Sequence, residues 1–374
     1  MATNRPEPWE PDLPELVEPS TWAAVDLGLI DATPKTAELL SRTDGVNLAY
    51  TGKMNWIYGV PESGKTWIAL LAAVQALNAG HRVLWLDYED SPETFVERMV
   101  ALGTKRAVIN DPARLAYVAP IDRLYDTRPG GGLDETKWSR HLGIRETHLA
   151  WTPHLVVVDS CAGGMALEAL SITSNDDVPQ WIRLYLRPFT NAGAGVIVID
   201  HLPKGAEADK RFPIGAQHKL ASLDGVALRC TTTKSWGRHP GGTTTEPVEG
   251  TVKLQVSKDR AGAVRAHITG DEAGTFHVEV WPNGDIVATI TAPDDANTDN
   301  HKRTTIITSA MVAVLKDSPP LQLAGLLALV AEEPGIVDSA AAIKAAIQIA
   351  QAHGHIDYDA GTKCYSLRNY DAEF

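Results

Sequence analysis

Short apolar runs with little alternation dominate the chain between residues 22 and 226. They are MNWIYG (54–59), RVLWLDYE (82–89), HLVVVD (154–159) and GVIVID (195–200). Runs of this kind are typical of parallel strands that helices cover on both faces. After the first run, TWIALLAAVQALNAG has the length and spacing of a buried helix that ends at Gly80. The pattern therefore predicts an α/β fold with a mostly parallel central sheet.

The pattern changes after about residue 226. We expect antiparallel strands joined by turns such as Asn283–Gly284, and we place them in VALRCTTT, TVKLQVSKD, VRAHITGD and TFHVEVWPNGDIVATI. Beyond residue 302 the pattern becomes helical in TIITSAMVAVLKD, PLQLAGLLALVAE and SAAAIKAAIQIAQAHG. HIDYDAGTKCYSLR then predicts a hairpin with its turn at Asp359 to Gly361. Three helices followed by a two-stranded wing describe a winged helix.

These patterns divide the chain into four parts. Residues 1–21 form a tail rich in proline and carboxylates, which we expect to be disordered or draped over the surface. Residues 22–292 form the core, with the antiparallel strands at its C-terminal end. Residues 293–302 form a linker, and residues 303–374 form the small winged-helix-like domain.

Composition narrows the possible partners and the compartment. The formal net charge of −13 argues against a protein that coats DNA, although a narrow basic channel for one strand stays possible. Cys161, Cys230 and Cys364 are far apart, so we expect reduced thiols and neither a disulfide nor a zinc site. The N-terminus has no apolar signal region and no run approaches a membrane span, so we expect a cytoplasmic protein.

The stretch GVPESGKT (59–66) matches the phosphate-binding pattern G-x-x-x-x-G-K-[ST] between a strand and a helix. Its glycines allow consecutive N–H groups to point at a β-phosphate, and the Lys65 ammonium would reach the β- and γ-phosphates. The Thr66 hydroxyl would be a ligand of Mg²⁺. We therefore predict binding of ATP and Mg²⁺ by Gly59, Val60, Pro61, Glu62, Ser63, Gly64, Lys65, Thr66 and Trp67.

Two acids follow apolar strands and are candidates for the chemistry. Asp159 ends HLVVVD, where it would hold Mg²⁺, or alternatively cap the next helix. Glu89 ends RVLWLDYE, where its carboxylate would deprotonate the attacking water. Asp87 is the rival base, because it alternates onto the same side of that strand. We favour Glu89, since catalytic groups sit at strand ends in sheets of this type.

His201 follows GVIVID directly and would hydrogen-bond a γ-phosphate, although a structural histidine is the alternative reading. The segment beyond it carries several cations within an acidic chain. It is either a solvated loop or a contact with DNA. The candidate DNA-binding residues are Lys204, Lys210, Arg211 and Lys219.

Lys258 and Arg260 in VSKDRAG form a second pair of cations, and alternation places both on one face of their strand. The pair would meet the γ-phosphate bound by a neighbouring subunit, where an arginine supplied in trans accelerates hydrolysis. A solvated hairpin end is the alternative.

With these residues in place, the chain resembles the RecA-like hexameric ATPases of the RepA and DnaB helicase class, and in particular the RepA-like group of phages and plasmids. The resemblance covers about residues 40 to 265. It implies that Glu89 activates water, His201 senses the γ-phosphate and Lys258 with Arg260 acts in trans. The residues that carry it are DGVNLAYTGKMNWIYGVPESGKTWIAL, VLWLDYEDSPETFVERMVALG, LVVVDS, VIVIDHLPKG, HKLASLDGVAL and VSKDRAG.

The resemblance further implies a homo-oligomeric ring, hexameric in that class, with active sites at subunit interfaces and movement on single-stranded DNA. GAQHK (215–219) departs from the Gly–Ser pair of many relatives, which leaves the DNA-contacting residues open. Our first hypothesis is a replicative DNA helicase with replication or recombination proteins as partners. The alternatives are a RecA-like recombination or strand-annealing ATPase and a nucleotide-switched DNA-binding regulator. One core can serve each of these functions.

Overall fold

The computed structural model of the protein describes residues 26–29, 33, 35–123, 143, 145–202, 219, 222–240, 247–268, 270–293, 307–308, 310–316, 318–333, 336, 340–352 and 356–367. The chain divides into two units, Met1–Pro34 and Lys35–Phe374. In the first unit a short 3-10 helix, η1 (Leu27–Leu29), has exposed side chains. The predicted tail (1–21) lies outside the described residues, as does residue 294 onward in the predicted linker.

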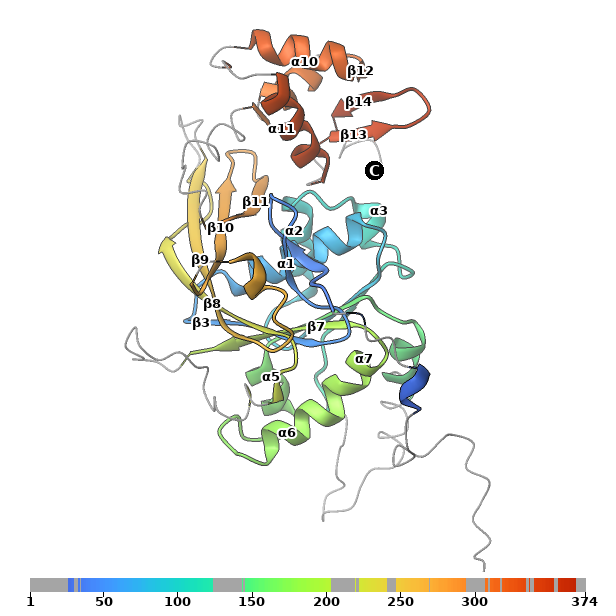
Figure 1. The fold of residues 1–374 in the computed structure, drawn as a ribbon, viewed down its shortest axis with the longest axis vertical. Coiled ribbons are helices and arrows are strands. Elements are labelled where there is room, and N and C mark those ends of the chain that lie inside the picture. The colour runs from blue at the N-terminus through green and yellow to red at the C-terminus, as the bar shows by residue number, and fades with distance from the viewer. Residues whose placement is uncertain are drawn as a thin grey trace, which may run out of the picture. The chain divides into compact units, whose positions relative to one another are not determined.

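A nine-stranded sheet forms the centre of the second unit, in the order β11-β10-β9-β8-β3-β7-β6-β4-β5 (Figure 1). The strands from β8 to β5 in this order run parallel, and β9, β10 and β11 extend the sheet antiparallel beside β8. The bounds are β3 (Met54–Gly59), β4 (Val83–Asp87), β5 (Leu115–Val118), β6 (Leu155–Asp159), β7 (Gly195–His201), β8 (Val226–Lys234), β9 (Val248–Asp259), β10 (Glu272–Val280) and β11 (Ile286–Thr291).

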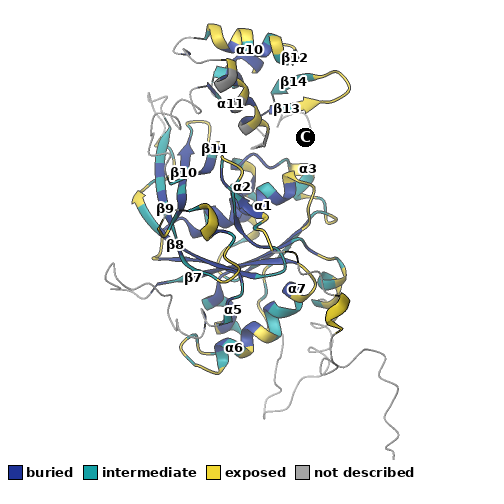
Figure 2. Cartoon of the chain, viewed as in Figure 1, coloured by how far each residue is buried: buried dark blue, intermediate teal, exposed yellow. Residues whose placement is uncertain are grey.

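Helices cover both faces of the parallel strands, as the uninterrupted apolar runs predict. Alternate residues of one strand enter different core clusters: Ile57 packs with the cluster of α1 (Lys65–Asn78) and α2 (Pro92–Ala101), and Trp56 with the cluster on the other face. That second face carries α5 (Cys161–Leu167), α6 (Asp177–Trp181), the π-helical turn η2 (Ile182–Leu186) and α7 (Arg187–Asn191). The buried residues accordingly concentrate along the sheet (Figure 2).

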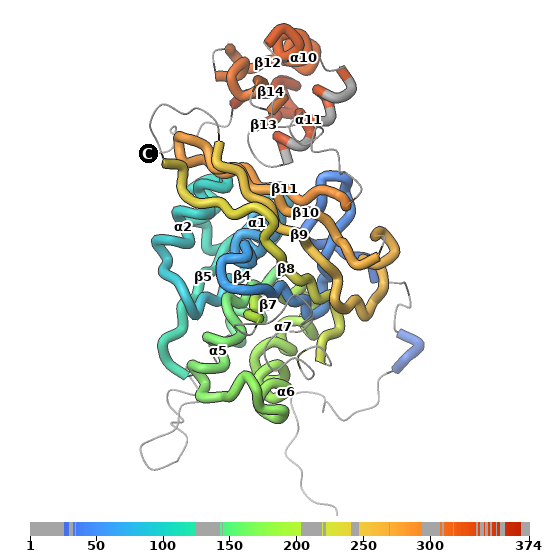
Figure 3. Tube along the Cα trace, turned by 90° about the vertical axis from the view of Figure 1, so that its left-hand side faces the viewer, coloured from blue at the N-terminus to red at the C-terminus, as the bar shows by residue number. Residues whose placement is uncertain are grey.

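The antiparallel strands β9 and β10 lie beside α1 (Figure 3). Their residues Val252, Leu254 and Phe276 belong to the core cluster that contains the buried side of α1. A short hairpin of β1 (Leu39–Ser41) and β2 (Asn47–Ala49) and the one-turn helix α3 (Arg106–Ile109) complete the described core.

One predicted strand is wrong. VRAHITGD contains the 3-10 turn η3 (Arg265–His267) in place of a strand. The Asp259 carboxylate accepts hydrogen bonds from the backbone N–H groups of Gly262, at 3.0 Å, and Arg265, at 2.9 Å. These bonds hold the segment as a turn, in the way that Asp side chains commonly organise the backbone that follows them.

The C-terminal residues have their own apolar core, with Met311, Leu326, Ile347 and Ile356 among its buried members. Residues 307–308 and 310–316 are helical, and a three-stranded sheet has the order β12-β14-β13. The predicted hairpin turn is confirmed, since Asp359 Oδ1 accepts from the N–H groups of Gly361 and Thr362. The bounds are β12 (Leu321–Gln322), α10 (Leu323–Glu332), α11 (Ala340–Ala352), β13 (Ile356–Asp359) and β14 (Cys364–Leu367). Within the described residues, no helix combines the length and apolar character of a membrane span.

Candidate active site

The carboxyl ends of four parallel strands meet at one edge of the sheet. Gly59 of β3 pairs with His201 of β7, and Asp87 of β4 pairs with Asp159 of β6. Val158 of β6 pairs with Val198 of β7, so these strands end within about two residues of one another. Ligands of open α/β sheets bind at this edge. A cleft there is lined by residues 60–67 together with Glu89, Asp159 and His201. The tertiary structure thus brings most of the predicted site residues together.

The phosphate-binding loop needs glycine at both glycine positions of its pattern. A Cβ on Gly59 would lie 2.4 Å from Ser63 Oγ and 2.6 Å from the Cys230 carbonyl oxygen. Gly64 has φ +79°, and a Cβ there would lie 2.7 Å from the Trp236 ring. Neither site has room for a side chain, so the loop lies tightly between β8, Trp236 and the start of α1.

The loop also contains polar groups that suit a phosphate. Ser63 Oγ is buried and has no hydrogen-bond partner among the described residues. Lys65 Nζ donates to the Val60 carbonyl oxygen at 2.7 Å, across the curl of the loop. Burial lowers the pKa of Lys65, while Asp159 and Glu89 raise it. An anion bound in the loop would satisfy both side chains, so these residues fit the triphosphate of ATP.

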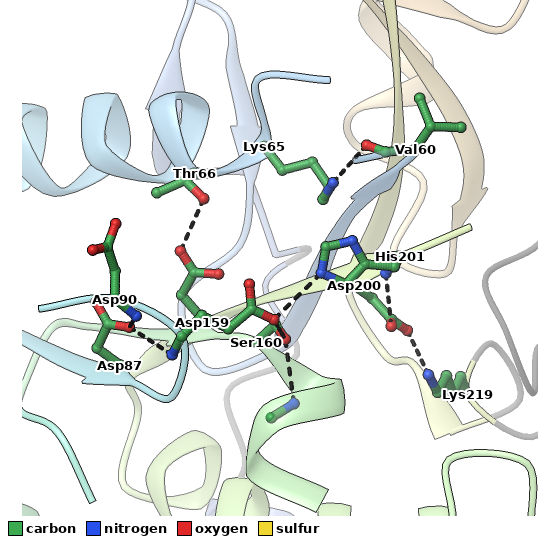
Figure 4. A network of polar contacts seen from close by, with 12 residues as sticks. Val60, Lys65, Thr66, Asp87, Asp90, Asp159, Ser160, Asp200, His201 and Lys219 are labelled. Carbon is green, nitrogen blue, oxygen red and sulfur yellow. Dashed lines mark hydrogen bonds and ion pairs between the residues drawn. The ribbon is translucent and has the colours of Figure 1, made fainter. Parts of the chain in front are cut away.

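Thr66 and Asp159 offer oxygen atoms side by side. Thr66 Oγ1 donates to Asp159 Oδ2 at 2.9 Å, and the two side chains point toward each other (Figure 4). Burial raises the pKa of Asp159 to about 7, the Thr66 bond lowers it, and Glu89 and Asp87 raise it further. A hydroxyl and a carboxylate in an acidic, buried place suit Mg²⁺, which prefers oxygen ligands.

Ser160, and not Asp159, caps the helix that follows. Its Oγ accepts from the N–H of Gly163 at 3.3 Å at the start of α5. The alternative interpretation of Asp159 as a capping residue is therefore wrong, and its carboxylate is available to the cleft.

Glu89 lies at the centre of a small polar cluster. Its Oε1 accepts a hydrogen bond from Ser160 Oγ and lies 3.4 Å from His201 Nε2. The His201 hydrogen bond is the largest cause of a lowered pKa for Glu89, burial opposes it, and Ser160 adds to it. The carboxylate is therefore ionised at neutral pH, as a general base requires.

Asp87, the alternative candidate for the base, has a different role from Glu89. It is buried, and its Oδ1 accepts from the backbone N–H groups of Glu89 at 3.0 Å and Asp90 at 2.8 Å. Ser91 caps α2 by accepting from the N–H of Thr94. Asp87 thus shapes the turn that presents Glu89, and Glu89 is the acid that lines the cleft.

The structure corrects the prediction made for Lys219. We predicted a DNA contact, yet Lys219 is 0 % exposed and its Nζ donates to Asp200 Oδ2 at 2.6 Å. A side chain that is fully enclosed and ion-paired cannot reach DNA, so this prediction is wrong. The other predicted DNA-binding residues, Lys204, Lys210 and Arg211, lie outside the described residues.

Arg260 lies near the opposite edge of the sheet from the loop of its own chain, and Lys258 lies between the two edges. Lys258 pairs with Ala227, which pairs with Trp56, and the N–H of Arg260 donates to the Gly225 carbonyl oxygen. The N–H of Gly225 donates to the carbonyl oxygen of Met54, the first residue of β3. Because a strand rises about 3.3 Å per residue, the Met54 end of β3 lies roughly 17 Å from Gly59. Arg260 is therefore out of reach of its own phosphate site, whereas Lys258 is level with Trp56, about 10 Å along β3 from Gly59.

Sequence reasoning missed one wall of the cleft. Residues 235–239 after β8 and the loop 281–285 between β10 and β11 line it, with Trp236 against Gly64 and Gly250. The sequence signal was a tryptophan within the polar stretch SWGRH. Isolated aromatic residues in loops are too common to identify a site without the fold.

With this geometry, residues 19–207 match the model of a protein family described as an AAA domain. The chain belongs to this AAA domain family. The match contains the phosphate-binding loop, Glu89, Asp159 and His201, so family membership and site geometry point to the same P-loop ATPase. The antiparallel strands and the C-terminal residues lie beyond the matched part. No curated protein matches the chain.

Proposed function

We propose that the protein is an ATP-hydrolysing, ring-forming motor on single-stranded DNA that acts as a helicase in phage or plasmid replication. One observation carries the hydrolytic part: the ionised Glu89 carboxylate, held by Ser160 and His201, opens on the same cleft as Lys65 and Asp159. Nucleotide binding alone requires no base at this position. A base beside the phosphate cradle favours turnover.

Each residue then has a chemical role. Glu89 accepts a proton from water as the water oxygen attacks the γ-phosphorus and the bond to the β-γ bridging oxygen breaks, which gives ADP and phosphate. Lys65 and the N–H groups of the loop bind the phosphate oxygens, and His201 hydrogen-bonds the γ-phosphate. Thr66 and Asp159 would hold Mg²⁺, which neutralises charge on the phosphates when it is bound.

The position of Arg260 supports a ring. Head-to-tail assembly is heterologous, so two different surfaces of each subunit meet. Arg260 near one edge of the sheet would then complete the phosphate site at the opposite edge of a neighbour. The resemblance to the RepA and DnaB class supports the same arrangement.

The C-terminal residues fit a winged helix in a supporting role. Its candidate recognition helix, α11, carries Lys344 as the one Lys or Arg of the sequence 340–352. Duplex recognition generally uses several phosphate contacts from Lys and Arg. We therefore assign the winged helix to contacts with subunits or partner proteins.

The decisive experiment measures the ATPase rate with and without single-stranded DNA and, in the same buffer, the mass of the assembly. We expect turnover that DNA stimulates, from a closed ring. Filaments that form on DNA without unwinding would favour the recombination or annealing ATPase. A monomer with DNA-independent turnover would contradict both.

A further inference from the structure

A buried ion pair lies beside the candidate active site and has no role in the chemistry above. Lys219 Nζ donates to Asp200 Oδ2 at 2.6 Å, and the two side chains are 0 % and 1 % exposed. The same ammonium lies 5.5 Å from the centroid of the buried Trp56 ring. Figure 4 shows Lys219 pointing at Asp200, which immediately precedes His201 in β7.

Stability does not account for this pair. Charges lose their hydration when they are buried, and the mutual attraction often does no more than offset that loss. Replacement of a buried ion pair by apolar side chains of similar volume is often neutral or stabilising. Burial also raises the pKa of Asp200, an effect that the Lys219 ammonium opposes. Without Lys219, the carboxyl group would tend to take up a proton.

Two neighbours of Lys219, Asp200 and Cys161, each precede or follow a site residue in the chain. Asp200 uses its second oxygen, Oδ1, to accept from the backbone N–H of His201 at 2.8 Å. The fully buried Cys161 thiol, whose pKa is raised by burial and by Asp200 and lowered by Lys219, follows Ser160 directly. Ser160 and His201 are the two residues that contact Glu89 Oε1. The Lys219 ammonium thus acts on residues that are adjacent in the chain to both partners of the candidate base, Ser160 and His201.

We infer that Lys219 is a positioning residue, which orients the Asp200 carboxylate so that it fixes the backbone of His201 and the contact of His201 with Glu89. This inference rests on the proposed hydrolysis at Glu89. The contact from His201 Nε2 to Glu89 Oε1 is 3.4 Å, at the long end for a hydrogen bond. A small displacement of β7 would break it, and misplacements near 1 Å can reduce turnover roughly 100-fold.

The test compares Lys219→Met with the double variant Asp200→Asn/Lys219→Met. The single variant leaves a buried carboxylate without its partner and is expected to lower the melting temperature. The double variant replaces both charges with neutral groups, and we expect its melting temperature to return close to that of wild type. We expect both variants to bind a fluorescent ATP analogue within about twofold of wild type, because the phosphate loop is untouched. Turnover should remain at least about tenfold lower in both.

Lys253→Met is the matched control, since Lys253 is ion-paired with Glu272 on the antiparallel strands and does not line the cleft. It should retain wild-type turnover. A stable double variant that hydrolyses ATP at the wild-type rate would overturn the inference alone. So would a double variant that loses nucleotide affinity and stability together, since the pair would then be purely structural. A wild-type protein without ATPase activity would overturn the proposed function and this inference with it.

Discussion

At the scale of single residues, the site separates two acids that lie two positions apart. Asp87 is buried and accepts two backbone N–H groups, whereas Glu89 is exposed to the cleft and contacts Ser160 and His201. A carboxylate occupied by the backbone is a poor proton acceptor for water. The hydrogen bonds of the turn therefore decide which acid can act as the base.

Glu89→Gln should abolish hydrolysis and preserve nucleotide binding. The amide has nearly the same shape but cannot take a proton from water, and loss of a general base typically reduces turnover by about 10²–10⁴-fold. Single-turnover hydrolysis and equilibrium binding of ATP, measured on the same preparation, separate the two effects.

Two further variants are compared with Glu89→Gln. Lys65→Ala should weaken ATP binding itself, because the ammonium belongs to the phosphate cradle. Asp90→Asn should behave like wild type, since its ion pair with Arg98, at 3.0 Å, is partly exposed and such pairs contribute little. Wild-type hydrolysis by Glu89→Gln would show that Glu89 is not the base.

At the scale of elements, the phosphate loop is shaped by its packing against β8. A Cβ on Gly59 would lie only 2.6 Å from the carbonyl oxygen of Cys230 in β8. A strand backbone cannot move without disturbing the sheet on both sides. The glycine at the end of β3 is therefore required by the neighbouring strand as well as by the ligand.

Gly59→Ala should destabilise the fold by about 1–3 kcal/mol, the usual effect of overpacking, and should also abolish ATP binding. Thermal unfolding and binding of a fluorescent ATP analogue measure the two effects. Gly80→Ala is the control, because Gly80 has φ +88° and no atom within 4 Å of a new Cβ. Its cost is only backbone strain, about 1–2 kcal/mol, with ATP binding intact. Normal ATP binding by Gly59→Ala would contradict the tight packing of the loop.

At the scale of the whole molecule, we propose that the active site is shared between subunits. The register of β9 against β8, and of β8 against β3, places Lys258 level with Trp56, and the backbone contact with Gly225 places Arg260 near the far edge of the sheet from its own loop. If Arg260 acts on ATP, it must act on the ATP of a neighbour. The family match ends at residue 207 and does not include this pair, so the proposal of a shared site is supported by the register and by the resemblance to the RepA and DnaB class.

Mixing two inactive variants tests the shared site. Arg260→Ala should bind ATP but hydrolyse it about 10³-fold more slowly, as expected for an arginine that acts in trans. Combined with Glu89→Gln, it should regain some activity, because some interfaces pair an intact Glu89 with an intact Arg260. Lys258→Ala should show a milder effect, since an ammonium lacks the bidentate fork of a guanidinium. Failure of rescue at every mixing ratio, with subunit exchange shown independently, would contradict the ring.

The interaction with DNA is a second question at this scale. With Lys219 excluded by its burial, Lys204, Lys210 and Arg211 remain as the predicted DNA-binding residues. Neutralising all three should weaken single-strand binding. It should also reduce the slope of log K against log salt by about 0.7 for each phosphate that the protein no longer neutralises. Basal ATP turnover should persist. An unchanged affinity and salt slope would place the DNA-binding surface on other residues.

Local sequence patterns were sufficient to predict the main parallel strands and the phosphate-binding loop. Uninterrupted apolar runs predicted β3, β4, β6 and β7, because strands buried on both faces leave few polar positions along their length. The loop was readable because its glycines, lysine and threonine lie close together in the chain. Glu89, Asp159 and His201 were predictable as strand-end residues, since parallel strands end at one edge of the sheet. The segment VRAHITGD was wrongly predicted to be a strand. Its own pattern does not include Asp259, whose carboxylate holds the segment as a turn.

What the fold decided depends on interactions between residues distant in the chain. Whether Asp87 or Glu89 faces the cleft, and whether Asp159 or Ser160 caps α5, was settled by hydrogen bonds that composition does not reveal. The Trp236 wall of the cleft required the pairing of β8 with β3. The charge of Lys219 suggested a surface position, but Asp200 and Trp56 enclose it. A lysine is buried or exposed according to its tertiary partners, and these are set by the packing of the whole sheet.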